Sequence, residues 1–157
     1  MNCKIEELVE EYSDMVMQIS YQNSFNKSDA EDITQEVFIK LIKNIDKLES
    51  REHIKAWLIR VTINLSKDYN KSFWRKNTCK LEEDIEYFDS ETQEILQELS
   101  KLKPMYRNIV YLYYYQQYKI NEIADLLKIN VNTVSSNLTR ARKQLKKILG
   151  EGGEDNK

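Results

Sequence analysis

Glycine and proline are scarce in this chain of 157 residues, which contains three glycines and one proline. Tight turns, hairpins and bulges usually need these residues, so their scarcity favours a helical protein over one built on sheets. The two cysteines, Cys3 and Cys79, lie far apart in the sequence, and neither belongs to a Cys-x-x-Cys pair. We therefore expect free thiols in a reducing compartment and no disulfide.

Long apolar runs are also missing. No run approaches the roughly eighteen residues that a membrane span needs. The acidic start, MNCKIEELVEEY, lacks the apolar core of a signal peptide. With 41% hydrophobic and 32% charged residues, the chain has enough material for the cores and surface of one or two small domains. We expect a cytoplasmic protein without membrane insertion.

The sequence lacks the residue patterns of an enzyme. His53 is the only histidine, and no set of His, Cys and carboxylate residues has the spacing of a metal site. The glycines all lie at residues 150–153, so a glycine-rich phosphate loop is excluded. The acidic run at 82–98 has no partner base, which is typical of a solvated segment. We predict that the protein is not an enzyme and uses no cofactor or metal.

Charge is distributed in blocks, although the formal net charge is only −2. Residues 1–50 carry a net −6, residues 51–80 a net +6, residues 81–100 a net −8 and residues 101–150 a net +8. A basic block by itself is usually a solvated helix face. Two basic blocks with an acidic one between them favour two surfaces that face nucleic acid.

Apolar residues recur at helical spacing along most of the chain. The spacing predicts helices over residues 4–21, 28–45, 53–76, 91–102, 104–117, 120–128 and 131–148. Ser28 with Glu31, and Ser90 with Gln93, have the spacing of capping boxes. Pro104 stands where a helix tolerates proline, at its first residue. Residues 46–52 are predicted to be a loop and residues 77–90 an acidic inter-domain linker.

The same spacing predicts which side chains are buried. In the second helix they are Ile33, Val37, Phe38, Leu41, Ile42 and Ile45. In the third helix they are Ile54, Trp57, Leu58, Val61, Leu65 and Tyr69. The tyrosines of residues 111–118 could form a base-stacking platform, but such a stripe more often packs with its hydroxyls in water, and we favour packing.

Residues 120–149 have the pattern of a helix-turn-helix motif. A short turn at residues 128–130 separates two amphipathic helices, Asn130 is a good N-cap, and the small Ala124 allows close helix contact. The second helix is expected to bury Val131, Val134, Leu138, Ala141, Leu145 and Ile148. It would then expose Asn132, Thr133, Ser135, Ser136, Thr139, Arg140 and Lys143.

These exposed residues suit DNA binding. Short polar side chains at a helix start reach base edges in the major groove, and arginine can donate two hydrogen bonds to guanine. Lys143, Lys146 and Lys147 would neutralise phosphates, which makes binding salt-dependent. The alternative is an ordinary helical hairpin with a basic solvent face, since cations also favour a helix C-terminus.

The motifs resemble a bacterial sigma factor, the subunit that directs RNA polymerase to promoters. The stretch EIADLL, followed by INVNTVSSNLTRARKQL, is similar to region four of that family. DAEDITQEVFIKLIKNI and AWLIRVTINLSKDY are similar to the polymerase-binding and promoter-opening helices of region two. The resemblance covers residues 5–149, and the absence of other large domains resembles the extracytoplasmic-function type. It implies region two at residues 1–76 and region four at 91–149. The tail GEGGEDNK, at residues 150–157, is expected to be disordered.

The resemblance assigns roles to individual residues. Binding to the β′ clamp helices of core polymerase is implied for Asp32, Gln35, Glu36, Phe38 and Lys40. Capture of the melted minus-ten strand is implied for the loop 46–55 and for Arg60, Asn64, Lys67 and Lys71. Reading of the minus-thirty-five duplex is implied above all for Ser135, Ser136, Thr139 and Arg140. The expected partners are core RNA polymerase, including its β flap, promoter DNA and an anti-sigma factor.

The resemblance also implies that the acidic linker lies in the nucleic-acid channel of the polymerase. The sequence departs from the family pattern at Lys128, where a glycine is frequent, which predicts strain in the turn. The main alternative is a free-standing helix-turn-helix regulator, which would bind duplex DNA without polymerase. The basic block at 51–80 argues against it.

Overall fold

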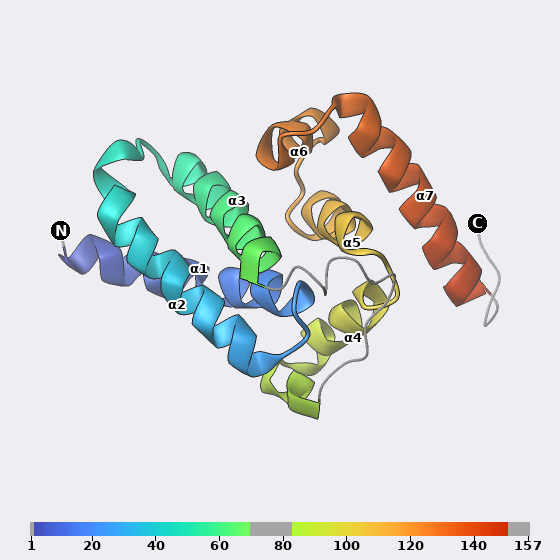
Figure 1. Ribbon diagram of the computed structural model, residues 1–157, viewed down its shortest axis with the longest axis horizontal. Coiled ribbons are helices and arrows are strands. Elements are labelled where there is room, and N and C mark those ends of the chain that lie inside the picture. Colours follow the sequence, from blue (N-terminus) through green and yellow to red (C-terminus); the bar gives the residue numbers. More distant parts are fainter. Residues whose placement is uncertain (1, 70–82, 151–157) are drawn as a thin grey trace. The chain divides into compact units, whose positions relative to one another are not determined.

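The computed structural model describes residues 2–69 and 83–150, and these residues form helices and no strand. They divide into two compact units, residues 2–69 with 83–87, and residues 88–150. Figure 1 shows the helices of both units. The predicted all-α fold with two helical domains is therefore confirmed. Of the predicted linker, residues 77–82 lie outside the described residues, and residues 83–87 form a helical turn of the first unit.

The first unit is built on α1 (Asn2–Gln22), α2 (Lys27–Asn44) and α3 (Arg51–Tyr69), each of which contacts the other two. The short helix η1 (Ile45–Lys47) follows α2, and η3 (Glu83–Tyr87) completes the unit. At the start of α3, Arg51 forms ion pairs with Glu7, at 3.7 Å, and with Glu11 of α1. The core is made of fully buried side chains that include Leu8, Val16, Ile19, Ala30, Ile33, Val37, Leu41, Ile54, Leu58 and Ile59.

The turn between α1 and α2 depends on Phe25 and Asn26. Phe25 has a positive φ of 51°, which is uncommon for a bulky residue, but its ring is buried edge-on against Tyr21 with the centroids 5.6 Å apart. Asn26 is the N-cap of α2, because its side chain accepts a hydrogen bond of 2.9 Å from the backbone N–H of Asp29. The predicted cap at Ser28 is wrong by two residues, since Ser28 already lies inside the helix.

The buried face of α3 differs from the predicted one. Ile54 and Leu58 are buried as expected, but the rest of that face is Ile59, Thr62, Ile63 and Ser66. Trp57, Val61 and Leu65 are half-buried, and Tyr69 is exposed. Two polar residues can be buried here because the hydroxyls of Thr62 and Ser66 donate to the carbonyls of Leu58, at 2.5 Å, and Thr62, at 2.7 Å.

The second unit contains α4 (Ser90–Leu99), α5 (Pro104–Val110), η4 (Tyr111–Tyr115), α6 (Ile120–Leu127) and α7 (Val131–Gly150). Both α5 and α6 pack on α7. Pro104 is the first residue of α5, as predicted. The N-cap of α4 is Asp89 and not Ser90, because the Asp89 carboxylate accepts from the N–H of Thr92 at 2.9 Å. The carboxylate is the stronger acceptor for this role, and the bond lowers the pKa of Asp89.

A buried arginine joins α4 to α5. Arg107 is fully buried, and its Nε atom donates to the backbone carbonyls of Leu99, at 3.1 Å, and Leu102, at 3.0 Å. These carbonyls lie at and just beyond the C-terminal end of α4, where backbone oxygens lack helical partners. The guanidinium on α5 therefore donates to backbone carbonyls at the end of α4 that would otherwise lack partners.

The helix predicted over residues 104–117 changes its geometry at Tyr111, where the π-helix η4 begins. The N–H of Gln116 donates to the carbonyl of Tyr111 at 3.1 Å, which closes the wider turn. Tyr111 is buried, and burial raises its pKa to about 12. The chain then leaves the helix through Gln117, which has a φ of 62°.

Candidate nucleic-acid and protein interfaces

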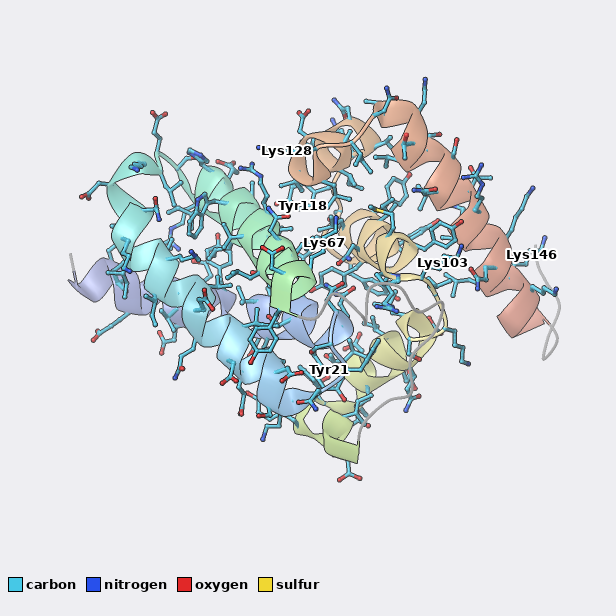
Figure 2. All side chains as sticks on the ribbon, in the orientation of Figure 1. Tyr21, Lys67, Lys103, Tyr118, Lys128 and Lys146 are labelled. Carbon is cyan, nitrogen blue, oxygen red and sulfur yellow. The ribbon has the colours of Figure 1, made fainter. Side chains whose placement is uncertain are left out.

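The turn between α6 and α7 has the predicted helix-turn-helix form. Lys128 ends α6 in the left-handed region with φ 58° and ψ 47°, a conformation that glycine adopts without strain. Asn130 then caps α7, and its side-chain oxygen accepts from the N–H of Asn132 at 2.8 Å. Ala124 is buried in α6, as expected at a close helix contact. Figure 2 marks Lys128 in this turn and Lys146 towards the far end of α7.

The second helix of this motif, α7, packs through a narrow stripe. Val134, Leu138 and Ala141 are buried, as predicted from their spacing. Val131 was expected to be buried but is 47% exposed, because the first turn of α7 contributes only Val134 to the core. Leu145 is half-buried, and the side chain of Ile148 lies outside the description.

The narrow stripe leaves the rest of the described α7 surface open to solvent. Every residue predicted to contact the minus-thirty-five duplex is exposed: Asn132, Thr133, Ser135, Ser136, Thr139, Arg140 and Lys143. Arg140 donates from Nη1 to the side chain of Asn137 at 3.3 Å, one turn earlier. The Thr139 hydroxyl donates to the carbonyl of Ser135 at 3.0 Å. Since α7 contains no acidic residue, this surface can accept DNA without charge repulsion.

Arg142 behaves differently from the other cations of α7. Its Nε atom donates to the Tyr114 hydroxyl at 2.6 Å, which raises the pKa of the guanidinium. The guanidinium also lies over the rings of Tyr113 and Tyr114, 5.5 Å and 5.7 Å from their centroids. One signal of this difference can be found in the sequence: two residues after Arg140, a side chain points to nearly the opposite side of a helix.

The predicted minus-ten residues lie on α3 with unequal access. Asn64 and Lys67 are exposed, and Figure 2 marks Lys67 near the end of the helix. Arg60 is half-buried, and its Nε atom is buried without a hydrogen-bond partner among the described residues. Lys71 lies outside the described residues. Among the described residues that are predicted to contact DNA, two on α3 are exposed, whereas all seven on α7 are exposed.

The predicted polymerase-binding residues share α2. Asp32, Gln35 and Glu36 are exposed, Lys40 is half-buried, and Phe38 is 9% exposed. The Asp32 carboxylate accepts a hydrogen bond of 2.9 Å from the hydroxyl of Tyr69, at the end of α3. This bond is the main cause of the raised pKa of Tyr69. This hydrogen bond thus connects the exposed acidic stripe of α2 to the C-terminal end of α3.

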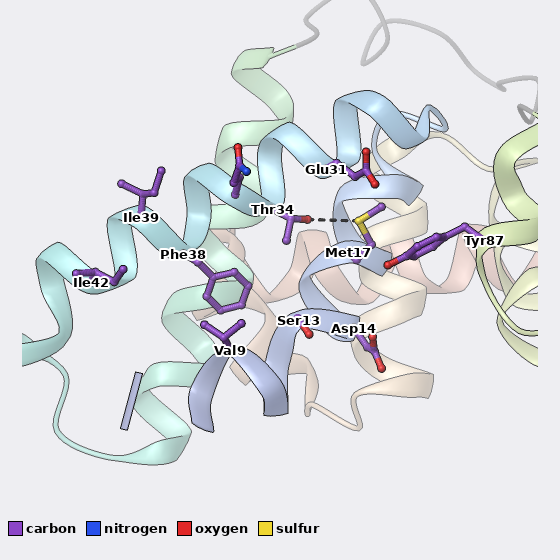
Figure 3. A pocket seen from close by; sticks show the side chains of 11 residues that line it. Val9, Ser13, Asp14, Met17, Glu31, Thr34, Phe38, Ile39, Ile42 and Tyr87 are labelled. Atoms are coloured by element: carbon purple, nitrogen blue, oxygen red, sulfur yellow. Dashed lines mark hydrogen bonds between the residues drawn. The ribbon is translucent and has the colours of Figure 1, made fainter. Parts of the chain in front are cut away.

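Beside this stripe lies a pocket of about 410 Å³ between α1, α2 and η3 (Figure 3). Its apolar lining is provided by Val9, Met17, Phe38, Ile39, Ile42 and Tyr87. The Thr34 hydroxyl donates to the sulfur of Met17 at 3.6 Å on its wall. Ile42 was predicted to be buried, but it is 54% exposed, because α2 packs through Val37 and Leu41 and turns the next residue outward.

The described part of the chain contains neither a candidate metal site nor a candidate membrane-spanning helix. No group of three or more His, Cys, Asp or Glu residues within 2–69 and 83–150 has the arrangement of a metal site. No helix in the same ranges is long and apolar enough to cross a membrane.

The comparisons with known proteins agree with this geometry. The models of sigma-70 region 2 and sigma-70 region 4 match residues 8–77 and 92–145. The ECF RNA polymerase sigma factor SigW of Bacillus subtilis is 28% identical, over 91% of this chain and 87% of its own length. The ECF RNA polymerase sigma factor SigE of Mycolicibacterium smegmatis is 31% identical, over 93% of this chain and 62% of its own length.

A solved structure has the same fold. The sigma factor RpoE of Bartonella quintana, crystallised with the anti-sigma factor NepR, superposes with a TM-score of 0.72 over 93% of this chain and 96% of that one, at 18% identity. The chain belongs to the sigma-70 family, as a sigma factor of the extracytoplasmic-function type that directs promoter-specific transcription.

Proposed function

We propose that the two units divide the work of initiation between α2 and α3 on one side of the linker and α7 on the other. In this division α2 captures core RNA polymerase, α3 holds the melted minus-ten strand, and α7 reads the minus-thirty-five duplex. The observation that carries the proposal is the exposure of every predicted reader on α7 around a buried stripe. The protein acts by binding and positioning, in the cytoplasm with the polymerase.

On α7, the readers are suited to a duplex. Short side chains such as Ser135 and Ser136 let the helix approach base edges closely, and Arg140 can donate to a guanine. Its hydrogen bond to Asn137 has a length of 3.3 Å, so little is lost when the guanidinium exchanges this acceptor for a base. Lys143, Lys146 and Lys147 supply the phosphate contacts.

On α3, the groups suit a single strand. Asn64 has an exposed amide that can pair with the edge of an unstacked base, and Lys67 places a cation one turn further along. On α2, the exposed carboxylates of Asp32 and Glu36 with Gln35 between them favour a basic polymerase surface. The apolar pocket beside them gives the same partner a place to bury a side chain.

Two substitutions with opposite expected effects test the division. Arg140→Ala should reduce promoter-specific initiation and leave polymerase binding unchanged, whereas Asp32→Lys should abolish polymerase binding. Pull-down with core polymerase and in vitro transcription on genomic fragments measure the two effects. Lys101→Ala and Glu6→Lys are matched controls on exposed residues outside the proposed interfaces. Tyr69→Phe is a third control, since it removes the hydrogen bond to Asp32 without changing charge.

Loss of polymerase binding in Arg140→Ala, or full binding in Asp32→Lys, would refute the division. The alternative of a free-standing regulator predicts promoter binding by the isolated protein that core polymerase does not change. Mobility shifts with and without the polymerase distinguish the two functions. The anti-sigma partner of the similar RpoE structure suggests one further partner, an anti-sigma factor.

A further inference from the structure

We propose that Arg142 is a positioning residue, which holds the recognition helix α7 against the tyrosine pair of η4 and does not contact DNA phosphate. The inference rests on the proposed role of α7 in reading duplex DNA. It separates Arg142 from Arg140 and Lys143, although the three cations lie within four residues of sequence.

The contacts of Arg142 use both properties of its guanidinium. The 2.6 Å hydrogen bond to the Tyr114 hydroxyl fixes one edge of the group. Its charge lies over two aromatic faces, at 5.5 Å and 5.7 Å, which is within the range of cation–π attraction. Lysine has the charge but not the planar group, so it cannot reproduce both contacts.

The tyrosines are themselves held in place. Tyr113 and Tyr114 pack edge-to-face with their centroids 4.9 Å apart. Both belong to the π-helix η4, whose wider turn brings consecutive side chains closer to one side than an α-helix does. Next to them, buried Tyr111 accepts a hydrogen bond of 3.0 Å from the side chain of Gln116. The ring pair thus belongs to the same π-helix as buried Tyr111, and it contacts α7 through Arg142.

The cluster contacts α7 at a position from which it can affect the orientation of the residues proposed to read DNA. Arg142 follows Ala141, the last buried residue of the packing stripe, and lies beyond Leu138. Beyond this point the described side chains of α7 are only half-buried or exposed. Beyond Ala141, the C-terminal half of α7 is held by Arg142 and by Gln144, whose side chain donates to the carbonyl of Lys101 at 3.3 Å. Of the two, Arg142 lies closer to the readers, so its contacts help to set the angle at which Ser135 to Arg140 meet the bases.

The experiment compares Arg142→Gln, Arg142→Lys and Tyr114→Phe in the holoenzyme, on a promoter fragment selected by in vitro transcription. We expect Arg142→Gln and Arg142→Lys each to lose about fivefold in promoter affinity. The slope of log affinity against log salt should stay that of the wild type. Tyr114→Phe should lose less, because the ring remains. Lys143→Ala is the matched comparison, whose slope should fall by about 0.9.

Four results would overturn the proposal. Rescue by Arg142→Lys, or a reduced salt slope in Arg142→Gln, would show a phosphate contact. Wild-type promoter affinity at a temperature where the folded variants are stable would show that Arg142 serves stability alone. Additive effects of Arg142→Gln and Tyr114→Phe on unfolding of the free protein would show that the two side chains do not interact.

The unfolding measurement contains no DNA, so it tests the contact independently of the proposed function. Arg140→Ala in the same promoter assay tests the function: no loss there would refute the role of α7 as a reader. A loss in Arg140→Ala with wild-type affinity in the Arg142 variants would refute only the positioning role.

Discussion

The two basic helices, α3 and α7, differ in how much of their surface is buried by packing. α3 contacts both α1 and α2 and buries a face that runs from Ile54 to Ser66. α7 buries only the stripe of Val134, Leu138 and Ala141. A helix that buries a narrow stripe can offer most of its side chains to a ligand, whereas one that buries a wide face can offer fewer. The basic charge of the sequence indicates both helices as candidates for DNA binding. Packing then decides how many side chains each helix exposes.

The largest expected effect concerns this difference in packing. Leu58→Ala in α3 should lower the free energy of unfolding by about 3–5 kcal/mol, because the cavity lies between packed helices on two sides. Leu138→Ala in α7 should cost about 2–3 kcal/mol, because Leu138 belongs to a narrow buried stripe whose more exposed neighbours can relax towards the cavity. Urea unfolding followed by circular dichroism measures both, with Ile39→Ala as an exposed control. A larger loss at Leu138 would contradict the comparison.

A second prediction separates the kinds of DNA that the helices bind. Lys143→Ala should weaken the closed promoter complex several-fold and reduce its salt slope by about one. Lys67→Ala should leave the closed complex unchanged and reduce the melted fraction. Filter binding at low temperature measures the first, and permanganate reactivity of unpaired thymines measures the second. Equal effects of both variants on the closed complex would remove the distinction between duplex and single-strand binding.

The start of each helix gives a third test. Asn130→Ala removes the hydrogen bond to the N–H of Asn132 and should cost about 1 kcal/mol of stability. Asn26→Ala should have a similar cost at α2, because its side chain has the same role towards Asp29. Asn130→Ser and Asn26→Ser keep a capping oxygen and should recover most of the loss. Thermal unfolding measures all four variants, and no recovery by serine would argue against capping.

The smallest effect concerns pH. The Asn130 cap cannot titrate, but the Asp89 cap of α4 can, and its hydrogen bonds with Thr92 lower its pKa below the ordinary 3.8. A carboxyl with a depressed folded pKa stabilises the protein above the unfolded pKa, and this contribution disappears as pH falls through the folded value. Between about pH 5 and about pH 2, Asp89→Asn should therefore lose less stability than the wild type. An identical acid profile would contradict this.

Sequence periodicity predicted α7 better than α3 for a physical reason. A narrow stripe at Val134, Leu138 and Ala141 repeats at regular spacing, so the exposed readers follow directly. The wider face of α3 includes Thr62 and Ser66, which a hydrophobic pattern counts as polar although their hydroxyls are satisfied within the helix. No local signal separates such residues from solvent-facing ones.

The cap errors have a similar origin. Both Asn26 and Ser28 are good capping residues, as are Asp89 and Ser90, and the sequence alone does not show which backbone N–H groups each one reaches. The π-turn at Tyr111 and the contact of Arg142 with two tyrosines depend on residues that only the folded unit brings together. The residue roles carried over from the family at Asp32, Asn64 and Arg140 remain predictions for the experiments above.

The buried guanidinium of Arg107 has a consequence for how the second unit opens. Arginine keeps its charge at any pH at which proteins are studied, so this group cannot escape its burial cost by losing a proton. If the end of α4 frays, the carbonyls of Leu99 and Leu102 move away and a buried cation loses two of its hydrogen-bond acceptors. Partial opening is then less stable than either the closed corner or full exposure to water. The α4–α5 corner should therefore exchange its amide hydrogens as one cooperative block, with no separate fraying of the α4 end.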